Sequence, residues 1–110
     1  MAMYIQYDEF LLLELFESDP ISIADEEAGI FMYTKMDNVG FKLMLTISIY
    51  EKQCNLSLVH DQYSIPVFEC KLDNVEELCT TTQGLTIRRP TSTNVIVTFK
   101  PNFSIQINNL

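Results

Sequence analysis

The chain lacks several features that would define a function at once. Its 110 residues include no tryptophan, one histidine and three glycines, and none of the glycines makes a loop that could cradle a phosphate. The apolar run over residues 10–16 is short and is interrupted by Glu14. It is therefore neither a membrane span nor the hydrophobic part of a signal peptide. We expect a cytoplasmic protein that does not cross or bind a membrane.

The cysteines and the histidine also form no catalytic or metal-binding pattern. Cys54, Cys70 and Cys79 are odd in number and lack the spacing of metal ligands, so we expect reduced, mostly buried thiols. His60 falls in a predicted turn beside Asp61, and no serine or cysteine is tied to it by spacing. An exposed turn histidine is favoured over a general acid or base. We therefore expect no enzyme, no cofactor and no metal site.

Positive charge is nearly absent from the first third of the chain. The net charge is −8, and all of it belongs to residues 1–37, where nine acidic residues stand against Lys35 alone. The remaining residues carry six acidic and six basic side chains. A basic surface is needed to bind phosphates, so nucleic acid is not expected as a partner. A basic protein partner fits the charge, because complementary fields speed encounter and select partners. The simpler interpretation is that the acids keep a small domain soluble.

Three clusters are candidate sites. The acids of residues 25–27 lack the alternating ligand spacing of a calcium loop, so a solvated turn, or contact with a basic partner, is preferred. Arg88 and Arg89 precede Pro90 and three hydroxyl residues at 91–93, which could hold a phosphate, but a charged strand end is the simpler interpretation. The aromatic residues near the acidic N-terminus are either interface anchors or part of the core. These are Tyr4, Tyr7 and Phe10.

The strongest structural pattern covers residues 41–50. Apolar residues at every second position, Phe41, Leu43, Leu45, Ile47 and Ile49, alternate with mostly more polar ones. Successive side chains of a strand point to opposite faces, so this pattern predicts a long, half-buried strand. We expect this strand to act as the template of the core.

The remaining segments predict a chain of strands joined by short connections, which favour antiparallel neighbours. Pro66 cannot donate to a ladder, so its strand is expected at an edge or with a bulge. Residues 8–17 predict a helix, with a buried strand as the alternative, and residues 73–78 predict a capped helical turn. Further strands are predicted over residues 21–23, 30–36, 54–59, 63–70, 85–89, 95–99 and 103–107.

Together these elements predict an α+β fold of one domain, residues 1–110. We expect a mainly antiparallel, strongly curved β-sheet with one or two short helices.

In its overall profile the chain resembles the small, acidic, cytoplasmic immunity proteins of contact-dependent growth inhibition and related bacterial polymorphic toxin systems. The features that carry the resemblance are the short single domain, the sequence pI near 4.4, the acids gathered in one segment, the many strands and the lack of a catalytic motif. The resemblance implies a protein that binds one toxin domain and blocks its active site or substrate groove.

Many such toxins are basic nucleases, so the resemblance implies an acidic surface that mimics a nucleic-acid backbone. The residues that suit this role are Asp8, Glu9, Glu14, Glu17, Asp19, Asp25, Glu26 and Glu27. The rival hypothesis is an assembly protein, in which edge strands pair across a two-fold axis and give a homodimer.

Overall fold

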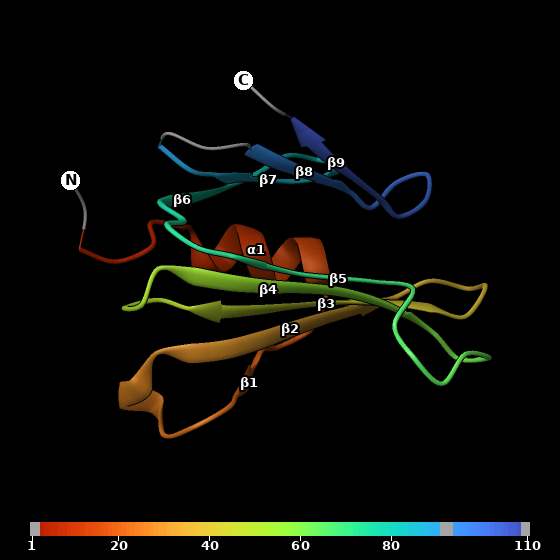
Figure 1. Cartoon of the computed structure of the whole chain (residues 1–110), viewed down its shortest axis with the longest axis horizontal. Coiled ribbons are helices and arrows are strands. Elements are labelled where there is room, and N and C mark those ends of the chain that lie inside the picture. Colours follow the sequence, from red (N-terminus) through yellow and green to blue (C-terminus); the bar gives the residue numbers. More distant parts are fainter. Residues whose placement is uncertain (1–2, 91–93, 109–110) are drawn as a thin grey trace.

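The computed structural model describes residues 3–90 and 94–108, apart from the side chains of Glu26 and Asn108. One α-helix and nine strands follow one another along this part of the chain, with a single 3₁₀ turn (Figure 1). In order they are α1 (Glu9–Phe16), β1 (Ile21–Ser22), η1 (Glu26–Ala28), β2 (Ile30–Met36), β3 (Phe41–Ser48), β4 (Gln53–His60), β5 (Phe68–Leu72), β6 (Glu77–Thr80), β7 (Gly84–Arg88), β8 (Asn94–Thr98) and β9 (Ser104–Asn108).

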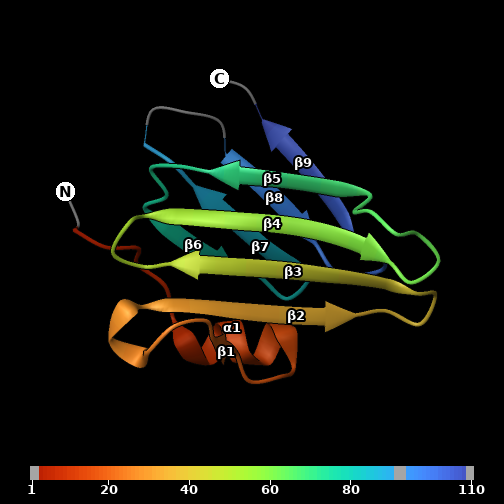
Figure 2. The same cartoon turned by 60° about the horizontal axis from the view of Figure 1, so that its bottom comes forward.

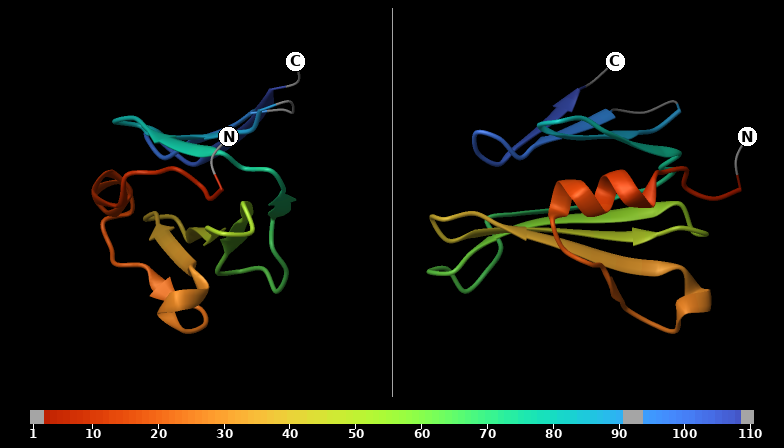
Figure 3. Two further views of the ribbon diagram at one scale, coloured as in Figure 1. Left: turned by 90° about the vertical axis from the view of Figure 1, so that its left-hand side faces the viewer. Right: turned by 180° about the vertical axis from the view of Figure 1, so that it is seen from behind.

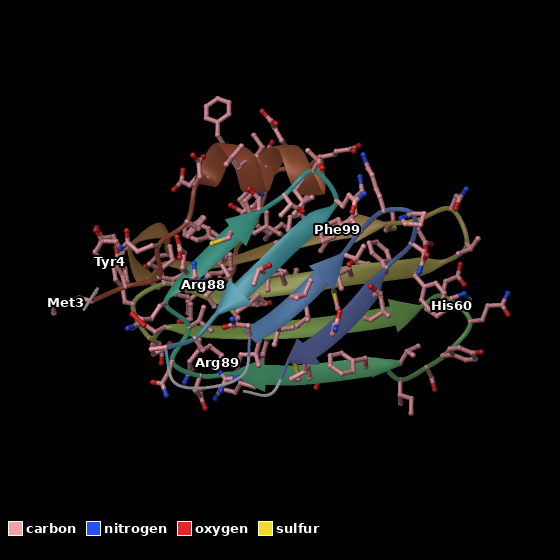
Figure 4. All side chains as sticks on the ribbon, turned by 90° about the horizontal axis from the view of Figure 1, so that it is seen from above. Met3, Tyr4, His60, Arg88, Arg89 and Phe99 are labelled. Atoms are coloured by element: carbon pink, nitrogen blue, oxygen red, sulfur yellow. The ribbon has the colours of Figure 1, made fainter. Side chains whose placement is uncertain are left out.

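The strands form two antiparallel sheets in simple sequence order. One sheet has the order β1-β2-β3-β4-β5 and the other β6-β7-β8-β9. The strongly curved single sheet expected from the sequence is therefore wrong, although the mainly antiparallel β character is confirmed. The four-stranded sheet lies over one face of the five-stranded sheet and crosses it obliquely (Figures 1 and 4). Two stacked sheets bury the apolar face of each, which a single sheet could do only by closing on itself.

β3 is the central strand of the larger sheet, and it has the half-buried character that its sequence pattern predicted. Leu43, Leu45 and Ile47 have no exposed surface, while the side chains between them are partly exposed. Tyr33 of β2 and Leu56 of β4 flank Leu45 and are also buried. The strand faces the second sheet with this apolar row, so the core lies between the sheets.

Helix α1 confirms the helical prediction for residues 8–17 over the buried-strand alternative. The Asp8 carboxylate accepts hydrogen bonds from the backbone N–H groups of Phe10 (2.9 Å) and Leu11 (3.1 Å), which are otherwise unsatisfied at a helix start. Glu17 ends the helix in a left-handed conformation with φ 58°. The helix lies beside the gap between the sheets (Figure 3) and buries Leu12 and Phe16.

Phe16 connects the helix to both sheets. Its ring centroid lies 5.3 Å from that of Tyr33 in β2 and 5.1 Å from that of Phe99, which follows β8. The second contact is edge-to-face at 83°, an arrangement that aromatic rings favour. The N-terminal segment makes a second connection. The Ile5 N–H donates to the carbonyl of Ile49, directly after β3 of the larger sheet, while Gln6 bridges to β6 of the smaller one.

The helical turn predicted for residues 73–78 is wrong. The segment is an extended crossover from β5 to β6, with Asn74 in the left-handed region at φ 57°. The N–H groups of Val75 and Glu76 donate to the carbonyls of Lys52 and Arg88 instead of forming a helical turn. Val75 is fully buried. Tertiary hydrogen bonds and burial outweigh a local capping pattern here.

The edge position predicted from Pro66 is confirmed, but the strand begins later. β5 starts at Phe68 and is the outer strand of the larger sheet, whereas Pro66 lies in the preceding loop. The other predicted strands match the observed ones to within a residue or two. Within the described residues, no helix has the length and apolar character needed to cross a bilayer.

Candidate protein-binding surface

The predicted acidic residues lie along one side of the molecule. They belong to α1, to its caps, and to the loop and 3₁₀ turn that lead into β2. In the figures this red-to-orange part of the chain stays together beside β2, away from β5 (Figures 2 and 3). We call the side formed by residues 8–28 the acidic edge. The acidic edge is strongly negative, because these residues include no lysine, arginine or histidine.

Three of the predicted acids make internal contacts. Asp8 caps α1, and Asp25 accepts a hydrogen bond from the N–H of Ala28 (3.0 Å) at η1. Glu17 pairs with Lys35, with 3.0 Å between its Oε1 and the lysine Nζ. A hydrogen bond from Lys35 and the charge of that lysine lower the pKa of Glu17. These side chains have structural tasks that do not depend on a partner.

Four other predicted acids are exposed and make no ion pair within the described part of the chain. They are Glu9, Glu14, Asp19 and Glu27. Carboxylates that are held on one edge and make no ion pair keep their field available to a partner. The Glu26 side chain lies outside the described residues.

Two of these exposed acids share a groove beside α1. The groove has a volume of about 520 Å³. Its walls are mostly apolar and come from the helix, the segments on either side of it and β2. They consist of Tyr7, Phe10, Leu13, Pro20, Phe31 and Tyr33. Glu9 and Asp19 complete the lining. We call this feature the aromatic groove.

The Glu9 carboxylate acts on the tyrosine pair of the groove. Tyr7 and Tyr33 both line the groove and interact electrostatically with each other. Burial raises the pKa of both tyrosines, and the negative charge of Glu9 raises both further. The phenols therefore stay neutral at physiological pH and serve as hydrogen-bonding groups beside a carboxylate.

The aromatic residues near the N-terminus divide between the two roles considered from the sequence. Tyr7 packs against the core, whereas Tyr4 and Phe10 are exposed, Phe10 by 74%. Such exposure of a phenylalanine beside a groove is typical of an interface residue. Phe31 and Tyr33 line the groove together with Phe10. They were missed because local sequence does not reveal that β2 packs beside α1.

A second hollow, of about 690 Å³, lies at the end of the larger sheet between the β2–β3 and β4–β5 connections. No motif in the sequence indicates this hollow. Met36, Tyr63 and Ile65 line it and are exposed by 64% or more. Its charges are mixed, with Lys42 against Asp37 and Asp61. We call it the hairpin hollow.

The prediction of an exposed His60 is wrong. Its side chain is only 16% exposed and packs between the rings of Phe41 and Tyr63. Nδ1 accepts the N–H of Gln62 (3.2 Å), which assigns the proton to Nε2, 2.9 Å from the Val39 carbonyl. Figure 4 places His60 at the end of the molecule opposite to Tyr4. Both ring nitrogens are engaged in joining two connections of the sheet.

The three cysteines are free thiols with structural positions. Cys54 is buried in the core. Burial raises the pKa of each of them, which disfavours the reactive thiolate. Among the described residues, no group of three or more histidine, cysteine or acidic side chains is placed to hold a metal ion.

The arginine cluster considered as a phosphate site is only partly described. Arg88 contacts Glu77 across the β6–β7 ladder at 3.4 Å, which matches the charged strand end favoured from the sequence. Residues 91–93, which were to supply the hydroxyl groups, lie outside the described residues.

Comparison with solved structures finds a match over the whole chain. No protein-family model matches the sequence, and no curated protein matches it either. The structure is similar to a chain of the contact-dependent growth inhibition toxin–immunity protein complex from Klebsiella pneumoniae 342. The TM-score is 0.82 over 100% of both chains, at 17% sequence identity. At that identity the similarity establishes a shared fold.

Proposed function

We propose that this protein is a cytoplasmic immunity protein, a non-catalytic inhibitor that binds and occludes a cognate toxin domain. The observation that carries the proposal is the full-length similarity to a chain of a toxin–immunity complex, with a TM-score of 0.82. A match over 100% of both chains relates the whole architecture, rather than one motif, to that kind of complex. A protein, and neither a nucleic acid nor a membrane, is the proposed partner.

The charge distribution supports the acidic edge as the binding surface. The net charge of −8 belongs to residues 1–37, and four of the acids are exposed and make no ion pair among the described residues. A toxin that acts on nucleic acid carries a basic active-site surface. We therefore propose a nuclease domain as the target, covered by a surface that presents negative charge in place of phosphates.

The test is a pull-down of the tagged protein at native expression level in its own cells, at low and at moderate salt. The proposal expects one stoichiometric basic protein, identified by mass spectrometry, whose recovery falls as salt rises. That protein should arrest growth when it is expressed alone and should be neutralised by co-expression. Recovery of no partner at either salt would contradict the proposal.

A homodimer is the second candidate, and the smaller sheet favours it. β9 is the last strand of that sheet, and its Ile107 is 48% exposed. An outer strand offers unpaired backbone groups to another copy. Analytical ultracentrifugation at high protein concentration distinguishes the candidates, because a strictly monomeric mass excludes a homodimer and leaves toxin binding unaffected.

A further inference from the structure

We propose that the aromatic groove binds an arginine- or lysine-bearing segment of the partner, with the side-chain stems on the aromatic walls and the cationic groups at Glu9 and Asp19. The inference rests on the proposed function and names the chemistry that the acidic edge recognises. The groove, rather than the acids alone, defines the site.

The walls of the groove suit the stems of long basic side chains. Four of the eight residues that line it are aromatic, and Leu13 and Pro20 add aliphatic surface. Lysine and arginine bury their methylene stems on such surface while the charged group reaches a polar rim. A guanidinium also stacks favourably on an aromatic face. The exposed ring of Phe10 is available for this contact.

The two carboxylates lie at opposite ends of the helix that forms one wall. Glu9 is the first residue of α1, and Asp19 lies three residues beyond its last residue, Phe16. Eight helical residues rise by about 12 Å. The separation allows a segment with two basic residues to use both ends of the groove, and a single arginine to use one.

The helix start does not oppose a cation at this site. The N-terminus of a helix carries roughly half a positive charge. Asp8 caps α1 and Glu9 stands in its first turn, so two full negative charges outweigh that partial charge. The neutral phenols of Tyr7 and Tyr33 add hydrogen-bonding groups beside Glu9.

The composition of the groove argues against other occupants. Among the residues that the structure describes, no lysine, arginine or histidine lines it, so an anionic ligand would meet only carboxylates. A purely apolar segment would take Glu9 and Asp19 out of water without pairing them, which is costly. The hairpin hollow, by contrast, has acidic and basic groups on its rim and therefore does not select a charge.

The test is an NMR titration of the ¹⁵N-labelled full-length protein with acetylated hexa-arginine amide. Hexa-citrulline amide is the probe for shape without charge. We expect hexa-arginine to shift the amide signals of the groove residues in a saturable way and hexa-citrulline to leave them unchanged. The combined variant Glu9→Gln and Asp19→Asn should weaken binding by about tenfold, because hydrogen bonds to charged groups are lost.

The matched control is the combined variant Glu14→Gln and Glu27→Gln, which removes the same charge outside the groove. All four positions are exposed, so each variant should keep the native amide spectrum. We expect the control to change the affinity by less than about twofold, since exposed charges act weakly at a distance. Equal weakening by the two variants, or shifts of equal size with hexa-citrulline, would overturn the proposal.

Binding of the partner recovered in the pull-down distinguishes failure of the groove proposal from failure of the proposed inhibitor function. If it binds the Glu9→Gln, Asp19→Asn variant as tightly as the wild type, the groove proposal fails and the inhibitor function stands. If no toxin is recovered, the inhibitor function fails, whatever the peptide does.

Discussion

Cys54 shows at the residue scale how burial decides chemistry in this molecule. The side chain lies in the core, and burial, assisted by the nearby Cys70, raises its pKa to about 12. At physiological pH its thiolate is therefore a very small fraction of the population. The residue acts as a small apolar side chain rather than as a nucleophile.

This burial predicts that the Cys54 thiol is unreactive in the folded protein. In a Cys70→Ser, Cys79→Ser variant, the remaining Cys54 should react with Ellman's reagent at pH 8 only on unfolding, and at once in concentrated urea. The reason is that both access and ionisation require the core to open. A native-state rate equal to that of a small free thiol would contradict the buried assignment.

The Glu17–Lys35 pair gives a prediction about pH. Because Lys35 lowers the pKa of Glu17, the pair contributes stability above the unfolded pKa of Glu17, and this is lost as pH falls through the folded value. In Lys35→Met, the pKa of Glu17 should rise towards its ordinary value. The measurement is a carboxyl ¹³C NMR titration, with the exposed Lys71→Met as control. An unchanged Glu17 titration would disprove the pairing in solution.

His60 and Phe31 show which residue-level features local sequence cannot reveal. His60 stands at the end of β4 beside polar residues, and this context predicted exposure. Its burial comes from Phe41, which the β3–β4 register places opposite it, and from Tyr63 in the following loop. Phe31 likewise joins the groove because β2 packs beside α1. By contrast, the exposed acids could be predicted individually, because charged side chains are almost always solvated.

At the scale of elements, α1 depends on a cap as well as on its buried face. Asp8→Ala removes the acceptor of two backbone hydrogen bonds and should lower the free energy of unfolding by about 1 kcal/mol. Asp8→Asn keeps the cap and removes only the charge, so it should cost much less. Urea unfolding measures both. Equal losses in the two variants would show that charge, and not capping, is responsible.

The contribution of strand β3 to stability should come from the apolar side chains on its buried face. Leu45 has no exposed surface, so Leu45→Ala should cost roughly 2–5 kcal/mol through lost burial and the cavity left behind. Thr46, on the other face of the strand, is partly exposed. Thr46→Ala should cost less than about 1 kcal/mol. Similar losses in urea unfolding would mean that the two faces are not distinguished by burial.

Helices and strands were predictable where the local pattern agrees with the tertiary environment. The alternation in residues 41–50 survives because one face of β3 is buried and the other is not. Residues 73–78 failed because Val75 is drawn into the core and the backbone pairs with Lys52 and Arg88. A capping pattern carries no information on such distant partners.

At the scale of the whole molecule, the charge asymmetry of the sequence becomes a spatial one. The chain order keeps residues 8–28 on one side, so acids that are neighbours in sequence remain neighbours in space (Figure 3). The division into two sheets could not be predicted. Short connections favour antiparallel neighbours, but they do not indicate where one sheet ends and the next begins. That division is decided by the crossover between β5 and β6.

The most direct test of the account measures the affinity of the recovered partner by isothermal titration calorimetry at low and moderate salt. One variant neutralises the four exposed acids of the acidic edge, Glu9, Glu14, Asp19 and Glu27. A control variant neutralises four exposed acids elsewhere, Glu51, Asp61, Glu69 and Asp73.

We expect the edge variant to lose about hundredfold in affinity at low salt, because several charge pairs are lost at once. For the same reason it should also lose most of the salt dependence of binding. The control variant, with the same net charge, should retain near-native affinity. Equal losses in the two variants, or full affinity in the edge variant, would contradict the claim that the acidic edge is where the partner binds.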